Sequence, residues 1–202
     1  MSVVRTRCRL PAAERRAGLV EAGLRVFGEA SYSGATTADI ARAAGVSEPI
    51  LYRHFPSKRA LYFACLDEMW RRLRERTEAI IAAEPDPAEW PFAAPKAFAE
   101  LRSRGVSCAH LWIQALSEAG DDPEVRRYLR RHLREVHDFL ADLIRRAQAA
   151  GGAAAACDPG AEAWIGMGIG LLRSVEERMG GLLDADDVAA ILAARRRSLG
   201  VG

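Results

Sequence analysis

The 202 residues of the chain are enough for one large domain or two small ones. Hydrophobic residues make up 50% of the sequence and charged residues 28%, which excludes a wholly disordered chain. No apolar run approaches the roughly 20 residues that cross a bilayer. No apolar segment follows Arg5, Arg7 and Arg9 as a secretory signal would require. We therefore expect a soluble, cytoplasmic protein with no membrane partner.

The formal charge is unevenly distributed. Residues 1–60 hold ten Lys or Arg and five Asp or Glu, a net of +5, whereas the whole chain carries +2, so the remainder carries −3. A basic first part on a mildly acidic remainder favours contact of that first part with a polyanion. The four cysteines form no C-x-x-C pair, so reduced thiols are favoured over a disulfide framework or a zinc site.

The composition favours helices almost throughout. Asparagine is absent and threonine is rare, while alanine, leucine, arginine and glutamate dominate. No stretch alternates apolar and polar residues as a half-buried strand would. In chain order the apolar spacing predicts helices over about 11–29, 36–44, 47–54, 57–83, 92–103, 106–119, 122–147, 158–179 and 184–197. The predicted fold is therefore all-α, with about nine helices.

Five of these helices have a recognisable start. A side chain that accepts from the first free backbone N–H groups stands at the cap position, in two cases directly before a proline. The predicted caps are Thr36 with Asp39, Ser47, Asp122, Asp158, and Asp184 with Asp187.

The helices over 36–44 and 47–54, joined at Gly45, form a helix-turn-helix pattern. Glycine at this turn permits a positive φ. An apolar seam between the two helices faces Phe27 and consists of Ile40, Ala41, Ala44, Val46, Leu51 and Phe55. This leaves an outer face on the second helix, short enough for its first turn to enter a major groove.

Side-chain chemistry gives the outer residues their predicted roles on double-stranded DNA. Hydroxyl and basic side chains suit the phosphate backbone: Thr36, Thr37, Tyr52, His54 and Lys58. Arg53 suits either a guanine edge or a phosphate, and Glu48 suits the amino group of cytosine. Ser47 begins the helix that carries them.

Pro49 and Ile50 offer apolar surface to a thymine methyl group. The helical spacing leaves a second interpretation open for Ile50, which is that it belongs to the core.

These residues resemble a known family. The run from 19 to 66 is similar to the DNA-binding head of TetR/AcrR-type transcriptional regulators. The resemblance is carried by Thr36-Thr37, Ile40-Ala41, Ala44-Gly45-Val46-Ser47, Leu51-Tyr52, His54-Phe55 and Lys58. It covers about a quarter of the chain and departs from the family at Ala60, where an acidic residue is frequent. Beyond Leu66 no motif is diagnostic.

The resemblance implies a homodimer in which the helices over 158–179 and 184–197 pack against their copies. Gly166 and Gly170 are spaced to allow close helix approach. The candidates for this interface are Trp164, Gly166, Met167, Gly170, Leu171, Val188, Ile191 and Leu192.

The resemblance also implies a pocket for an unknown small-molecule effector, whose binding shifts the helix that begins at Ser57 and releases a palindromic operator. The candidates for the lining are Trp70, Phe98, Trp112, Gln114 and Trp164. For the aromatic candidates, an ordinary core position is the alternative interpretation, and for Gln114 the alternative is a position that faces solvent.

Together these features predict a DNA-binding domain over 1–56 and a ligand-binding and dimerisation domain over 57–202. Residues 1–10 are either a basic arm for the minor groove or a tail. The predicted protein is a ligand-responsive regulator, a repressor rather than an activator, with no catalytic site, cofactor or metal. The alternatives are an enzyme with an appended helix-turn-helix, and an effector-independent DNA-binding or transcription-activating module.

Overall fold

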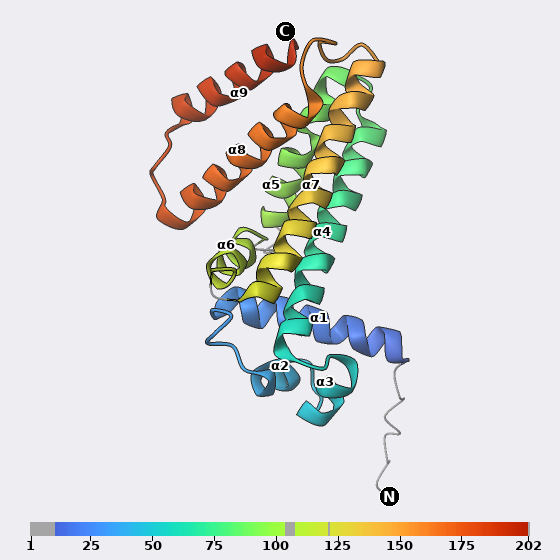
Figure 1. Cartoon of the computed structure of the whole chain (residues 1–202), viewed down its shortest axis with the longest axis vertical. Helices are drawn as coiled ribbons and strands as arrows, with labels where there is room; N and C mark the ends of the chain where they lie inside the picture. Colours follow the sequence, from blue (N-terminus) through green and yellow to red (C-terminus); the bar gives the residue numbers. More distant parts are fainter. Residues whose placement is uncertain (1–10, 104–107, 121, 202) are drawn as a thin grey trace, which may run out of the picture. The chain divides into compact units, whose positions relative to one another are not determined.

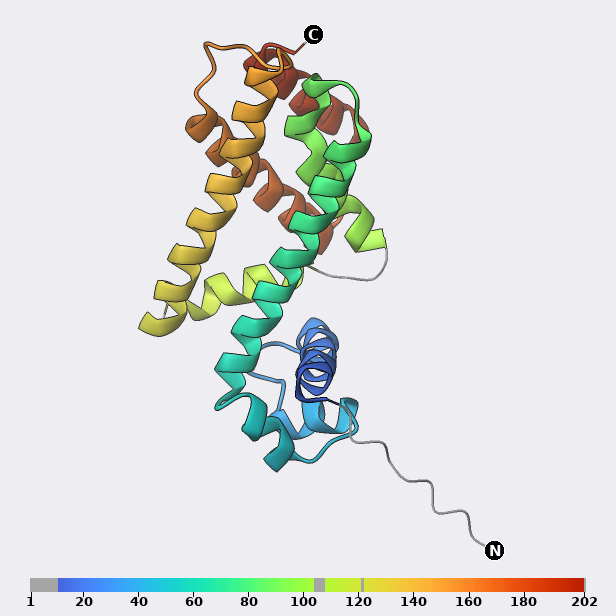
Figure 2. The same ribbon diagram turned by 90° about the vertical axis from the view of Figure 1, so that its right-hand side faces the viewer.

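The computed structural model describes residues 11–103, 108–120 and 122–201, and every regular element in these ranges is a helix (Figures 1 and 2). The all-α prediction is confirmed. The chain forms two compact units, which divide in the sequence between Glu68 and Met69. The basic arm over 1–10 and the predicted helix start at Val106 lie outside the described residues.

The first unit holds α1 (Ala12–Glu29), α2 (Thr37–Ala43), α3 (Glu48–His54) and the start of α4 (Lys58–Ala83). The second unit holds the rest of α4, the 3-10 helix η1 (Pro87–Phe92), α5 (Ala93–Ser103), α6 (Cys108–Glu118), α7 (Pro123–Ala149), α8 (Pro159–Met179) and α9 (Ala185–Leu199). Within the described ranges no helix has both the length and the apolar character of a membrane span.

Three predicted aspartate caps are confirmed. Asp122 accepts from the backbone N–H groups of Glu124 and Val125, and Asp158 accepts from that of Ala161. At the start of α9, Asp184 and Asp187 each accept from the other's backbone N–H, which is a complete capping box. These caps place the beginnings of α7, α8 and α9 where the sequence predicts them.

The prediction that the Ser47 hydroxyl caps α3 is wrong. Ser47 has the extended backbone of a cap residue, but its side chain makes no capping hydrogen bond. Its carbonyl oxygen instead accepts from the N–H of Ile50 at 2.9 Å and of Leu51 at 3.2 Å. Two features account for the difference: Pro49, the second helical residue, has no N–H, and the N–H of Ile50, the third, donates to the Ser47 carbonyl oxygen and not to its hydroxyl.

Aromatic packing holds the first unit together. Phe27 of α1 meets Tyr62 of α4 edge-on at 5.0 Å, and Tyr32 lies 4.8 Å from the same ring. Nearby, α1 approaches α4 closely at Gly23, where a β-carbon would lie 2.8 Å from the Cys65 sulfur. Burial raises the pKa of the Cys65 thiol far above its usual range, so this cysteine is an inert packing residue.

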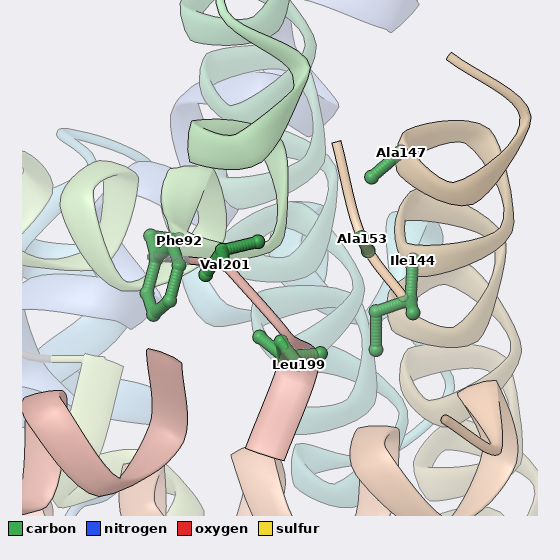
Figure 3. Packing of buried hydrophobic residues seen from close by; sticks show 6 residues of the cluster. All are labelled: Phe92, Ile144, Ala147, Ala153, Leu199 and Val201. Atoms are coloured by element: carbon green, nitrogen blue, oxygen red, sulfur yellow. The ribbon is translucent and has the colours of Figure 1, made fainter. Parts of the chain in front are cut away.

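In the second unit the end of the chain is built into the core (Figure 3). Leu199 and Val201 are buried against Phe92 of η1 and Ile144 of α7. The turn between them depends on Gly200, whose φ is 68° and where a β-carbon would lie 2.5 Å from that of Ala154. The C-terminal end of α9 is therefore fixed to the end of α7 and the loop after it.

The helices α8 and α9 form an antiparallel pair with polar contacts at both ends (Figure 1). At the turn, Glu176 accepts from the backbone N–H groups of Gly181, Leu182 and Leu183. At the other end, Glu162 and Arg195 form a buried ion pair, and Arg195 Nη2 also donates to the Glu162 carbonyl oxygen at 2.7 Å. The hydroxyl of Ser198 donates to the Glu162 carboxylate.

Removing one member of this ion pair leaves the other charge buried and unpaired. We expect Arg195→Ala to lower the free energy of unfolding by about 3 kcal/mol or more, measured by urea denaturation. Arg197→Ala, an exposed position on the same helix, is the control and should change it by less than about 0.5 kcal/mol. Equal effects of the two substitutions would contradict the importance of the pair.

Candidate nucleic-acid interface

The turn between α2 and α3 has the geometry that the sequence predicts at Gly45. Gly45 has φ 66°, in the left-handed region. Its N–H donates to the Arg42 carbonyl at 3.1 Å, and the N–H of Val46 donates to the Ala41 carbonyl at 2.9 Å. This is the Schellman arrangement, in which the left-handed residue satisfies the last carbonyls of the preceding helix. It ends α2 and directs the chain into α3.

The apolar seam holds α2 and α3 against the rest of the first unit. Ile40, Ala41, Leu51 and Phe55 are buried, as is Phe27 opposite them. Ala44 and Val46 lie at its edge and are half-buried. The buried side of α3 is therefore fixed, which determines the residues that its other side presents to solvent.

The predicted outer face of α3 is present but not uniform. Pro49 and Arg53 are exposed, and Tyr52 is a large hydrophobic side chain that is 48% exposed. Glu48, Ile50 and His54 are half-buried. Ile50 therefore lies at the boundary of core and surface, and its burial is compatible with either predicted role, a core residue or a contact with a thymine methyl group.

Thr36 is an exposed residue at the start of α2, and its hydroxyl is engaged locally. It accepts from the backbone N–H of Asp39 at 3.1 Å and lies 2.5 Å from the Asp39 carboxylate, to which it donates. Arg42 pairs with the same carboxylate at 2.8 Å. The Thr36 hydrogen bond, followed by that of Arg42, holds the pKa of Asp39 below its usual value.

Thr37 and Glu48 join the starts of α2 and α3. The Thr37 hydroxyl donates to the Glu48 carboxylate at 2.6 Å and lies 3.1 Å from the Tyr52 hydroxyl. No sequence pattern indicates this cluster, because Glu48 and Tyr52 lie 11 and 15 residues after Thr37 and each of the three suits DNA by itself. The Glu48 carboxylate thus has a partner within the protein at the site where we predicted a base contact.

Lys58 also has protein partners. Its ammonium group donates to the Ala35 carbonyl at 2.8 Å and lies 4.6 Å from the centre of the Tyr32 ring. These contacts tie the start of α4 to the segment that precedes α2. The predicted phosphate contact of Lys58 is not tested by them and stays a prediction.

Two arginines of α1 support the site and were missed by the sequence analysis. Arg16 lies over the Phe55 ring at 4.7 Å, and Arg25 donates to the Ala43 carbonyl at the end of α2 at 3.3 Å. Both were counted only as part of the basic charge, since their partners are distant in the sequence. They hold α2 and the end of α3 against α1.

Comparison with known proteins agrees with this geometry. The profile of the family described as "Bacterial regulatory proteins, tetR family" matches residues 19–65. The HTH-type transcriptional regulator BetI of Agrobacterium fabrum is 30% identical over 71% of this chain and 73% of its own length. This chain belongs to the TetR family.

Other relatives match over a shorter share of their length. BetI of Rhizobium meliloti is 32% identical over 62% of this chain, and the HTH-type transcriptional activator FasR of Mycolicibacterium smegmatis is 31% identical over 68% of it. The chain spans 62% of the length of each of these two relatives.

Solved structures show the same fold at low identity. A TetR-family regulator from Rhodococcus sp. superposes with a TM-score of 0.80 at 22% identity, covering 93% of this chain and 99% of that one. AibR, solved in complex with isovaleryl coenzyme A and operator DNA, superposes with a TM-score of 0.65 at 21% identity, covering 93% and 100% of the two chains.

In the second unit of this TetR-family chain, two predicted pocket residues converge on a histidine. The ring of Trp112 lies 4.8 Å from that of His132 on α7, and Trp70 meets the same ring edge-on at 6.0 Å. Tyr128 and Phe139 complete this group, which we call the His132 cluster. His132 is 1% exposed. None of the three α7 members was predicted for the pocket, because Tyr128 and Phe139 suit the core of any amphipathic helix and a single histidine beside them forms no motif.

The remaining pocket candidates differ in their burial. Phe98 on α5 and Gln114 on α6 are half-buried. Trp164 is 44% exposed on α8, where it stacks on His137 at 4.5 Å and lies under Arg134. Both predicted roles of Trp164, in the pocket lining and at the dimer interface, stay predictions.

The dimer candidates lie on α8 and α9. Trp164, Gly170, Leu171 and Leu192 are exposed, while Gly166, Met167, Val188 and Ile191 are half-buried. Gly166 has a partner in its own chain, because a β-carbon there would lie 3.3 Å from the Arg195 guanidinium. This contact within one chain explains why a glycine suits position 166, without reference to a second copy.

The burial of α3 makes a direct comparison of neighbouring residues informative. We expect Leu51→Ala to lower the free energy of unfolding by about 2–5 kcal/mol, because Leu51 is fully buried in the seam. Ile50→Ala, next to it and half-buried, should cost well under half as much. Thermal or urea unfolding of both variants measures the difference, and similar losses would assign Ile50 to the core.

Proposed function

We propose that this protein is a ligand-responsive DNA-binding regulator, acting as a repressor, that binds a palindromic operator as a dimer. The observation that carries the proposal is the outer face of α3. One side of this helix is locked into the core by Leu51, and the other presents Pro49, Tyr52 and Arg53 to solvent. A short, rigidly held helix with such a face matches the way a helix-turn-helix enters the major groove.

The predicted contacts keep their roles in the proposal, with one exception. Arg53 contacts a guanine edge or a phosphate, and Ser47, Pro49 and Ile50 lie nearest the bases. Thr36, Thr37, Tyr52, His54 and Lys58 position the head on the phosphate backbone. The hydroxyl protons of Thr36 and Thr37 are used within the protein, so these two residues act through the backbone N–H groups at the start of α2, and Tyr52 acts through the packing of its ring. The exception is Glu48, whose carboxylate is engaged by Thr37.

The proposed functions of the two parts of the chain are those predicted from the sequence. Residues 1–56 bind DNA and residues 57–202 bind the effector and the second copy. The two compact units divide slightly later, within α4 after Glu68. The first turns of α4 are thus part of the unit that carries the proposed DNA contacts, so a shift of α4 is a direct route by which an effector would act on that unit.

The proposed dimer uses the exposed apolar side chains of α8 and α9. Ile165 and Leu171 are each 49% exposed, and Leu192 is exposed on α9. Such a set of exposed large apolar side chains on adjacent helices is typical of a surface covered by a partner. A second copy is the partner proposed here, because a palindromic operator requires two heads related by a twofold axis.

The proposed effector site lies among the residues of the His132 cluster and the half-buried candidates Phe98 and Gln114. The AibR complex with isovaleryl coenzyme A and operator DNA is an example of one such fold with both kinds of ligand. An effector that binds only the folded protein raises its melting temperature, which distinguishes this proposal from an effector-independent module. FasR, named as an activator, is the reason to keep activation as the alternative to repression.

The DNA-binding proposal is tested by selecting sites from a randomised duplex library with the full-length protein. We expect enrichment of a palindrome, and fluorescence anisotropy should show affinity for it that falls steeply with salt. Arg53→Ala should weaken binding by about 1–3 kcal/mol and relax the preference at one base pair of each half-site. Arg42→Ala, which removes an exposed arginine paired with Asp39, is the control. An unchanged base preference in Arg53→Ala would exclude a base contact for Arg53.

The dimer is tested by light scattering of the purified chain. We expect a mass of twice the 22.0 kDa of one chain. Replacing both Leu171 and Leu192 by glutamate should give monomers, because like charges would face each other across an apolar interface. Leu116→Glu on α6, which is exposed to a similar degree, should leave the dimer intact. Dimers of the double variant would place the interface elsewhere.

A further inference from the structure

The Glu48 carboxylate is hydrogen-bonded to Thr37 within the first unit, and this bond changes the role that Glu48 can have on DNA. A glutamate at the start of a recognition helix suits the amino group of cytosine by its chemistry. Here the carboxylate instead accepts from the Thr37 hydroxyl at 2.6 Å, across the turn between α3 and α2. The two side chains are half-buried, so this contact is partly shielded from water.

The hydrogen atoms of the cluster can be assigned from this contact. A carboxylate only accepts, so the single hydroxyl proton of Thr37 points to Glu48. The Thr37 oxygen then has only lone pairs left for Tyr52, whose hydroxyl lies 3.1 Å away, so Tyr52 is the donor in that pair. The direction is therefore Tyr52 to Thr37 to Glu48.

This direction has an effect on both hydroxyls. A donor that gives its proton to a charged acceptor becomes a stronger acceptor itself, so Glu48 strengthens the hold of Thr37 on Tyr52. Tyr52 is 48% exposed, and its hydroxyl contact with Thr37 holds one end of the ring. The cluster thus fixes the orientation of the Tyr52 ring on the outer face of α3, where the ring packs on the DNA while its hydroxyl proton stays on Thr37.

We infer that Glu48 is a positioning residue, which sets operator affinity by orienting Tyr52 through Thr37 and does not read a base. The inference rests on the proposed function, since it concerns the same DNA contacts. A glutamate that reads a base would affect both the affinity for DNA and the base preference, whereas a positioning glutamate affects the affinity alone. Loss of Glu48 should weaken binding to every sequence, and it should leave the base preference unchanged.

The charge of Glu48 requires its own control. Removing any carboxylate from the head makes its field more positive and strengthens non-specific attraction to DNA. Glu29→Ala removes an exposed carboxylate of α1 in the same unit and provides this baseline. Glu48→Gln removes the charge but keeps an oxygen that accepts from Thr37.

The experiment compares full-length Glu48→Ala, Glu48→Gln, Thr37→Val and the double variant Glu48→Ala/Thr37→Val with Glu29→Ala. Affinity is measured by anisotropy on the duplex that the unaltered protein enriches from a randomised library, and on a duplex of unrelated sequence. Each variant is also taken through the library selection, and its melting temperature is recorded.

We expect Glu48→Ala to bind the enriched duplex roughly three- to tenfold more weakly than Glu29→Ala, with the same base preference. In the Thr37→Val background the same substitution should have almost no further effect, because Glu48 acts through Thr37. Glu48→Gln should retain most of the affinity. A global loss of stability would not reproduce this rescue and this dependence on Thr37.

A changed preference at one base pair in Glu48→Ala or Glu48→Gln would overturn the inference and make Glu48 a base reader. An equal loss with and without Thr37 would also overturn it. If Glu48→Ala does not fold, Glu48→Gln still decides between the two roles by its base preference. Failure of the unaltered protein to enrich any sequence would overturn the proposed function, and the role of Glu48 with it.

Discussion

The burial of one side of α3 is the constraint on which the rest of the DNA-binding unit depends. Leu51 and Phe55 are buried, as are Ile40 of α2 and Phe27 of α1, and this burial fixes the rotation of α3 about its own axis. Once that rotation is fixed, Pro49, Tyr52 and Arg53 must lie outside. The turn at Gly45 fixes the remaining freedom, because its left-handed backbone ends α2 and sets the direction in which α3 leaves. The binding surface is thus a consequence of packing on its opposite side.

Polar contacts then refine what the apolar packing has set. In the first unit the Thr37–Glu48–Tyr52 cluster and Lys58 connect segments that the seam brings together. In the second unit Glu162 and Arg195 have the same role between α8 and α9, at a buried site where an unpaired charge would be costly. On an isolated helix each of these side chains would be surrounded by water and would have no fixed orientation. Their partners give them a defined direction, which apolar contacts alone do not supply.

The differences from the sequence-based expectations arise where two features compete for one residue. Ser47 was expected to cap α3 through its hydroxyl, but Pro49 has no N–H and the N–H of Ile50 donates to the Ser47 carbonyl oxygen. Gly166 was predicted at an interface with a second copy, and the structure adds a contact within its own chain, because its missing β-carbon makes room for Arg195. Trp164 was predicted for a pocket or an interface from its size, and the structure adds that it is 44% exposed on α8. In each case the residue type was informative, and its partner could not be identified from its neighbours in the sequence.

The sequence by itself determined the helices, their starts at Asp122, Asp158 and Asp184, the turn at Gly45 and the family. These features depend on residues within one or two turns of each other, where spacing and capping chemistry are sufficient. Only the tertiary structure decided which side chains pair: Thr37 with Glu48, Lys58 with Ala35, and Arg195 with Glu162. Such pairs form between helices whose relative rotation follows from the packing of the whole core, and no local pattern records that rotation.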